Sequence, residues 1–228
     1  MNIQMVVYQF KITLKEIEPV IWRRIVVPAT YSFWDLHVAI QDSMGWLDSH
    51  LHVFCIANPR TGKIDEIGIP DDDPFGDELV FIPGWELPIV DYFIRPGDRA
   101  EYEYDFGDSW EHELVLEGIL LKETKTKYPK CTGGARACPP EDCGGVHGFQ
   151  EMLKIIRNPS HEEHKSIMEW LGGKYDPKTF DPDVIRFDNP KKRWRMRSRT
   201  GSPFSAIDFH CRGDNNVIIF EGRFGGDR

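Results

Sequence analysis

Apolar and polar residues alternate along the first part of the chain in the pattern of a half-buried β-strand. Every second residue from Tyr8 to Leu14 is apolar, and a second apolar run over residues 20–27 ends at Pro28. Successive side chains of a strand point to opposite faces, so these patterns predict strands over residues 8–15 and 20–27. Glu18-Pro19 between them predicts a turn, and the chain is expected to open with a hairpin.

The spacing of apolar residues then changes to that of a helix. From Phe33 to Met44 they recur three and four positions apart, with Ser32 as the expected N-cap and Gly45 at the end. Residues 51–57 alternate again and predict a third strand. A hairpin, a helix and a strand in this order are typical of the opening of a β-grasp-like α+β domain.

A proline-rich stretch over residues 70–98 follows. It contains five prolines and the acidic run 71–73, so a long loop is expected, with one short strand over residues 79–82. Three consecutive aspartates can bind a cation, but a solvated loop is the favoured interpretation.

Residues 100–116 predict a second hairpin, in which aromatic residues alternate with acidic ones on both sides of a turn at 107–109. Like charges opposite each other weaken a hairpin, so the acids are expected either to point into water or to pair with bases such as Arg23 and Arg24.

Helical spacing returns from Phe149 to Ile156, and Ser160 with Glu163 predicts a capping box for a further helix. The whole pattern predicts an α+β fold: a β-grasp-like mixed sheet with a packed helix, followed by a helical C-terminal part.

Charge divides the 228-residue chain into two parts. The net charge is −9, yet residues 191–228 hold nine bases and four acids, which leaves 19 bases and 33 acids in residues 1–190. We therefore expect one acidic α+β domain over 1–190 and a basic extension over 191–228. The composition excludes a membrane protein, a collagen-like fibre and a wholly disordered chain. An acidic body also argues against nucleic acid as the default partner.

The cysteine count and the first residues of the chain indicate the cellular compartment in which the protein is expected. Five cysteines are an odd number, and Lys11 and Lys15 interrupt the apolar run near the start before a signal-peptide core can form. No stretch is long enough to span a bilayer. A reducing cytoplasmic compartment is expected, without a membrane partner and with thiols that are free or metal-bound.

The first candidate for chemistry is the turn of the second hairpin. Asp105, Asp108 and His112 lie near one another in the sequence, and carboxylates with an imidazole are the groups used in acid–base catalysis or metal binding. The alternative, which is favoured, is that the two carboxylates accept hydrogen bonds from turn amides and His112 packs on the aromatic face.

The second candidate is a Gly- and Pro-rich loop with three cysteines and a histidine within 17 residues. Cys131, Cys138, Cys143 and His147 form a Cys₃His set that suits tetrahedral zinc, although the spacing is not that of a standard zinc finger. Packing of three small thiol side chains in a reduced protein is the favoured alternative. Zinc is therefore the candidate cofactor.

The basic extension contains a cluster over residues 191–199, with six bases and one tryptophan. Such a cluster suits contact with a phosphate backbone. A disordered tail, or a tail that docks on the acidic body, is at least as well supported.

Three motifs in the same order resemble the plasmid pRiA4b Orf-three-like family. They are Tyr8-Gln-Phe-Lys-Ile with Ile21-Trp-Arg-Arg24, the turn from Tyr104 to His112, and Cys138-Pro-Pro-Glu-Asp-Cys-Gly-Gly145. The resemblance covers about residues 5–190. It implies a compact α+β domain associated with plasmids and mobile elements, and it transfers no activity and no catalytic residue.

Two functions remain open. The leading hypothesis is a non-catalytic binding module that recognises a protein or nucleic-acid component of a mobile element through the 105–112 turn and the 138–145 loop. The rival is a metal-dependent hydrolase that uses Asp105, Asp108 or His112 beside a metal on the cysteine loop. The candidate binding residues are Trp110, Glu111, Arg136, Glu141, Asp142, Gly144 and Gly145.

Overall fold

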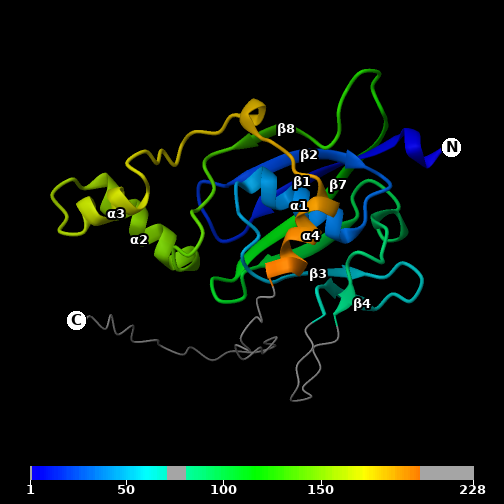
Figure 1. The fold of residues 1–228 in the computed structure, drawn as a ribbon, viewed down its shortest axis with the longest axis horizontal. Coiled ribbons are helices and arrows are strands. Elements are labelled where there is room, and N and C mark those ends of the chain that lie inside the picture. Colours follow the sequence, from blue (N-terminus) through cyan, green and yellow to red (C-terminus); the bar gives the residue numbers. More distant parts are fainter. Residues whose placement is uncertain (1, 71–80, 201–228) are drawn as a thin grey trace, which may run out of the picture.

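One eight-stranded sheet forms the centre of the molecule (Figure 1). The computed structural model describes residues 2–70 and 81–200, with side chains up to residue 195. The strands are β1 (Val6–Leu14), β2 (Trp22–Pro28), β3 (His52–Ala57), β4 (Ile64–Gly68), β5 (Ile82–Pro83), β6 (Arg99–Tyr104), β7 (Trp110–Leu121) and β8 (Lys130–Ala135). The helices are α1 (Phe33–Met44), α2 (Gly145–Arg157), α3 (His164–Trp170) and α4 (Pro190–Thr200), and short 3-10 turns occur at Ile3–Met5, Ile89–Asp91 and Pro182–Val184.

The strand order is β5-β4-β3-β6-β7-β1-β2-β8, and every neighbouring pair is antiparallel except β4 with β5. A mixed α+β fold is therefore confirmed. The β-grasp label is not, because β3 pairs with β6 and lies on the far side of β6 and β7 from the first hairpin. The helical C-terminal part is not confirmed either, since residues 171–189 are mostly irregular and contain only one short 3-10 turn.

Helix α1 covers one face of the sheet and closes the hydrophobic core. Its Phe33 is fully buried and meets Phe54 of β3 edge to face, with ring centroids 5.2 Å apart. Phe10 of β1 meets Phe93 in the same way at 4.8 Å. Burial of one such ring stabilises the fold by about 1.5–3 kcal/mol, so this aromatic layer fixes α1 on the sheet.

The opposite face of the sheet carries the acids of the second hairpin, and several of them are paired. Glu117 forms a 2.5 Å ion pair with Arg24, Lys15 contacts Glu101 and Glu111, and Arg99 contacts Glu113. The pairing predicted for Arg24 is thus present. Arg23, the preceding residue of β2, points to the other face and is buried.

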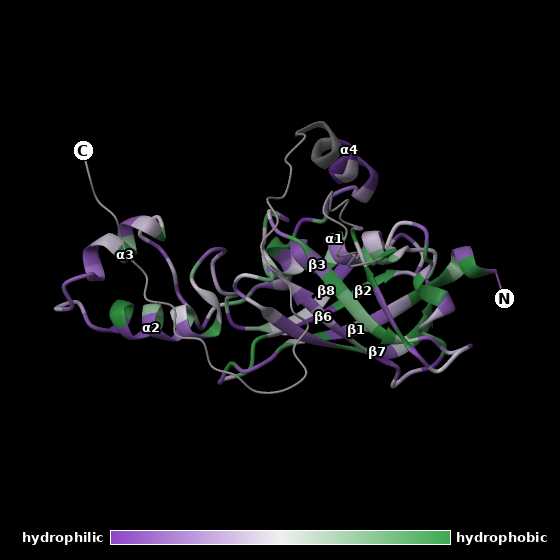
Figure 2. Cartoon of the chain, turned by 90° about the horizontal axis from the view of Figure 1, so that it is seen from below, coloured by the Kyte–Doolittle hydropathy of each residue, from purple (hydrophilic) through white to green (hydrophobic). Residues whose placement is uncertain are grey.

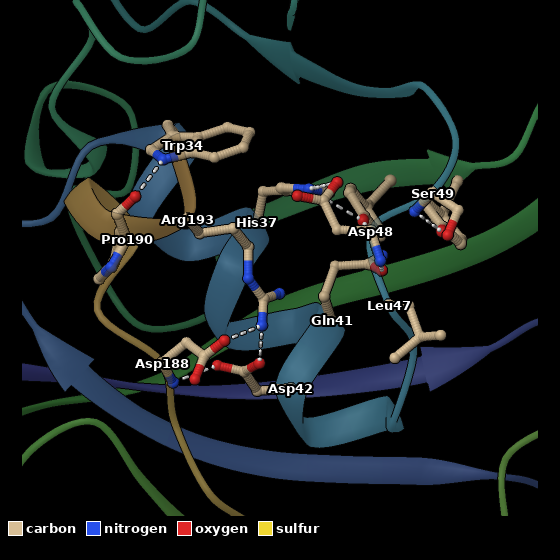
Figure 3. Close-up of polar contacts among 12 residues, drawn as sticks. Trp34, His37, Gln41, Asp42, Leu47, Asp48, Ser49, Asp188, Pro190 and Arg193 are labelled. Carbon is tan, nitrogen blue, oxygen red and sulfur yellow. Dashed lines mark hydrogen bonds and ion pairs between the residues drawn. The ribbon is translucent and has the colours of Figure 1, made fainter. Parts of the chain in front are cut away.

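Helix α4 lies on the outer side of α1, which separates it from the sheet (Figure 2). Nη2 of Arg193 lies 2.6 Å from a carboxylate oxygen of Asp42 and 2.6 Å from one of Asp188, and the Trp34 indole N–H donates to the carbonyl of Pro190 (Figure 3). Arg193 of the extension therefore docks on the acidic body, one of the alternatives left open by the sequence. Residues 201–228 and the acidic run 71–73 lie outside the described residues.

Helices α2 and α3 stand to one side of the sheet (Figure 1). The chain enters α2 through a loop that follows β8, and a hydrophobic stripe that includes Phe149 and Met152 is buried. Across the described ranges, 2–70 and 81–200, no helix is both long enough and apolar enough to traverse a lipid bilayer.

His112 of β7 belongs to the hydrophobic core. Its side chain is fully buried, lies 5.4 Å from the Trp46 ring and makes a 3.2 Å hydrogen-bond contact between Nδ1 and the carbonyl oxygen of Tyr102. Burial lowers the pKa of His112 from 6.5 to about 4. The imidazole is therefore neutral in the folded protein at neutral pH.

The two expected N-caps give a matched pair for a test of stability. Ser32 forms a full capping box with Asp35 on α1, whereas α3 begins one turn later than expected and the Ser160 hydroxyl does not cap it. We expect Ser32→Ala to lower the free energy of unfolding by about 1 kcal/mol and Ser160→Ala to change it by less than about 0.5 kcal/mol. Urea denaturation of both variants measures the difference, and equal losses would contradict this account of the caps.

Acid is expected to destabilise the protein through His112. Between pH 6.5 and 4 the unfolded chain binds a proton that the native His112 does not, so stability falls as the pH decreases through this window. The expected contribution is about 3 kcal/mol at its full extent. His112→Phe should flatten this pH dependence and the exposed control His147→Phe should not, as measured by urea denaturation at several pH values. An unchanged slope in His112→Phe would refute the assignment.

Candidate functional site

The turn between β6 and β7 is organised by Asp105. Its backbone has a positive φ of 58°, and its Oδ1 accepts hydrogen bonds from the backbone N–H groups of Gly107 at 3.1 Å and Asp108 at 3.3 Å. Burial raises the pKa of Asp105, and the positive charge of a protonated His50 together with the N–H groups opposes this shift. The sequence interpretation of Asp105 as a residue that binds turn amides is therefore correct.

The loop that follows β8 crosses the end of the sheet to reach this turn. β8 is an edge strand, and β2 and β1 separate it from β7. On the way the Trp46 indole N–H donates to the Pro139 carbonyl at 3.0 Å, and the Tyr104 hydroxyl donates to Glu141 at 2.5 Å. The backbone N–H of Leu47 also donates to Glu141, at 3.0 Å. Three hydrogen bonds thus fix the middle of the loop.

The end of the loop packs directly on the turn. The Gly144 N–H donates to the Asp108 carboxylate at 3.2 Å. Gly145 has a φ of 64°, and a Cβ at this position would lie 2.5 Å from the Asp108 carbonyl oxygen. Only glycine fits such a close approach in the left-handed region. Gly144 and Gly145 therefore join the two segments that the sequence singled out.

A third segment, residues 46–50, lies against the turn and the loop. A buried polar network holds this segment in position. His37 of α1 lies 2.8 Å from the Asp48 carboxylate, and the Gln41 side-chain oxygen accepts from the Asp48 N–H at 3.2 Å (Figure 3). The Ser49 N–H donates to the Tyr104 hydroxyl at 3.0 Å. These contacts set the position of the next residue, His50.

His50, Asp105 and Asp142 converge where the three segments meet. Nε2 of His50 lies 2.9 Å from Asp142 Oδ1 and 3.4 Å from Asp105 Oδ2. The three ligand atoms lie within 4.8 Å of one another, and within the described part of the chain no other group of three His, Cys, Asp or Glu side chains does so. The Asp142 side chain is 70% exposed, whereas that of Asp105 is 10% exposed. We call residues 105–109, 139–145 and His50 the turn–loop site.

Several of the residues predicted for the site lie elsewhere. Trp110 and His112 are fully buried on the core side of β7, so neither side chain reaches the turn–loop site. Glu111 lies on the exposed face and contacts Lys15. Arg136 begins the loop with a φ of 69°, and it makes no ion pair with any described residue.

The predicted cysteine site does not converge. Among the described residues, Cys131, Cys138, Cys143 and His147 do not supply three ligand atoms within 4.8 Å of one another. Cys138 packs against the Met44 sulfur at 3.6 Å, and Cys131 is buried beside Gly133. Burial raises the pKa of the Cys138 and Cys143 thiols to about 12. Protonated, packed thiols match the alternative interpretation of these cysteines.

Two known proteins are similar to this chain over most of its length. The uncharacterized protein y4hQ of Sinorhizobium fredii (strain NBRC 101917 / NGR234) is 35% identical over 197 residues, which cover 85% of this chain and 96% of the relative. The crystal structure of the protein of unknown function MM3350 from Methanosarcina mazei Go1 matches with a TM-score of 0.73 and 43% identity, over 80% of this chain and 98% of that one.

The sequence model of the family described as Plasmid pRiA4b ORF-3-like protein matches residues 6–184. That range contains the sheet, α1 and every residue of the turn–loop site. The chain therefore belongs to the plasmid pRiA4b ORF-3-like family.

Proposed function

We propose that this protein is a non-catalytic binding module whose turn–loop site holds a divalent cation at His50, Asp105 and Asp142. The observation that carries the proposal is the convergence of one imidazole and two carboxylates from three separate segments of the chain. Each segment is fixed by its own hydrogen bonds, so the donors are positioned before a ligand arrives.

The donor set suits a transition-metal ion such as Zn²⁺ or Mn²⁺. Imidazole and carboxylate are common ligands of these ions, and bond lengths of about 2.0–2.2 Å are typical for zinc. Asp142 is largely exposed and has room to adjust its side chain, whereas Asp105 is held by the turn amides. Three protein ligands leave coordination positions open on the exposed side, where a carboxylate of a partner fits.

The acids around the site are engaged in structure, which supports binding rather than catalysis. Asp108 accepts the Gly144 N–H, and Glu141 accepts the Tyr104 hydroxyl and the Leu47 N–H. His112, the predicted acid–base group, is enclosed in the core. These contacts support a role for Asp108 and Glu141 in holding the loop.

A protein partner fits the charge of the body better than nucleic acid. Residues 1–190 hold 33 acids and 19 bases, a balance that repels a phosphate backbone. The plasmid-associated description of the family supports a partner encoded by a mobile element. Recognition would then combine the bound cation with the exposed surface of the turn–loop site.

Calorimetric titration of the metal-free full chain with Zn²⁺ and Mn²⁺ tests the cation site. We expect one ion per chain, and we expect His50→Ala and Asp142→Asn each to weaken binding by at least about tenfold, because each removes one of three ligands. Both side chains are partly exposed, so thermal unfolding of the metal-free variants should match the wild type. Glu162→Gln on the distant helical hairpin is the matched acidic control and should bind normally.

Two results would contradict the proposal. Stoichiometric binding that survives both substitutions but is lost in Cys138→Ser would place the metal on the cysteine loop. Metal-dependent turnover of a phosphodiester or peptide substrate that is lost in His50→Ala would make the site catalytic and favour the hydrolase.

A further inference from the structure

Arg23 of β2 is a buried cation at the opposite end of the same loop. Its side chain is 2% exposed, and among the residues that the structure describes its hydrogen bonds go only to carbonyl oxygens. Nε donates to Ser43 at 2.9 Å, and Nη1 donates to Trp22 at 2.9 Å and to Ala135 at 3.0 Å. These bonds connect the last turn of α1 to β2 and β8.

The positive charge of Arg23 has no counter-ion among the described residues. No described carboxylate lies within 4.0 Å of its guanidinium, and Nη2, which carries two N–H groups, makes no hydrogen bond to a described residue. Burial lowers the pKa of Arg23, although an arginine stays charged at neutral pH. A buried charge without an opposite charge is costly, so an anion beside it would be favoured.

A cavity of about 650 Å³ opens beside this guanidinium. Arg23, the exposed Lys178 and the exposed Asp181 line it together with apolar side chains that include Met44 and Val184. We call this space the Arg23 cavity. Its volume falls within the range of small-molecule sites, and apolar walls with a few polar groups are typical of such sites.

Residues 178–181, with Val184 and Ile185, form one wall of the Arg23 cavity. The Phe180 ring lies over the Arg23 guanidinium, 3.9 Å from its central carbon to the ring centroid. The same ring occupies the space where a side chain at position 134 would stand, which the sequence leaves open with Gly134. The ring therefore shields one face of the guanidinium from water and strengthens any ion contact at Nη2.

We propose that the Arg23 cavity binds a small organic anion, with its carboxylate or phosphate at Nη2 of Arg23 and its apolar body against the cavity wall. Lys178 supplies the second positive charge. A purely structural role for Arg23 explains the three carbonyl contacts, but it does not explain why a charged side chain whose Nη2 has no hydrogen-bond partner among the described residues lines an open cavity. This site is distinct from the turn–loop site, and neither proposal depends on the other.

The test uses the full chain and three aromatic probes. Benzoate and phenyl phosphate carry the two anionic groups, and benzyl alcohol is the neutral control. We expect saturable binding of one anion per chain by calorimetry, with no saturable binding of benzyl alcohol. The tighter of the two anionic probes identifies the preferred group.

Substitutions then locate the site. Lys178→Glu places a carboxylate near Arg23 and should weaken binding by at least about tenfold, whereas Lys174→Glu makes the same charge change on an exposed residue outside the cavity and should change it by less than about twofold. Arg23→Gln should abolish anion binding. If the Arg23→Gln variant does not fold, the comparison of the Lys178 and Lys174 variants still decides the test. The proposal is overturned if neither anion binds saturably, or if both lysine variants weaken binding equally.

Discussion

The loop that leaves the edge strand β8 passes the ends of β2 and β1 and reaches the β6–β7 turn before α2 begins. The hydrogen bonds made by Trp46 and Tyr104 fix that crossing. Trp46 holds Pro139, and Tyr104 holds Glu141, so the loop lies against the sheet rather than in solvent. Burial raises the pKa of Tyr104, and contact with the Glu141 carboxylate adds to the shift, which keeps this hydroxyl a donor. Everything proposed for function lies along this crossing.

The two proposed sites lie at the two ends of the crossing. Ala137 and Cys138 at its start line the Arg23 cavity, and Asp142 near its end faces His50 and Asp105. The loop is short and is held at several points, so its two ends keep fixed positions relative to the sheet. Under the two proposals, a cation site and an anion cavity therefore lie at opposite ends of one loop.

Local sequence patterns predicted most helices and strands correctly, but they did not predict which strands pair with one another. The alternation before Leu14, the cap at Ser32 and the glycine at Gly45 act within a few residues, and the structure confirms all three. Strand β8 was missed because Gly133 and Gly134 weaken its signal, and it is held as a strand by pairing with β2. The capping box at Ser160 was wrong because the next helix begins later.

The sequence predicted only part of the candidate site, because only part of the site carries a local sequence signal. The turn at Asp105 and the loop ending at Gly145 carry local signals, and the structure places them in contact. His50 has no local signal, since its position depends on Asp48, which contacts His37 across the core. The sequence equally gave no sign that Arg23 is buried without a carboxylate partner among the described residues.

The measurement that tests the central claim most directly is anomalous diffraction at the zinc edge from crystals of the full chain grown with Zn²⁺. The account predicts a peak at about 2.0–2.2 Å from Nε2 of His50 and from a carboxylate oxygen of both Asp105 and Asp142. A crystal that shows a zinc peak among Cys131, Cys138 and Cys143 instead, or no peak at the turn–loop site at saturating Zn²⁺, would contradict it.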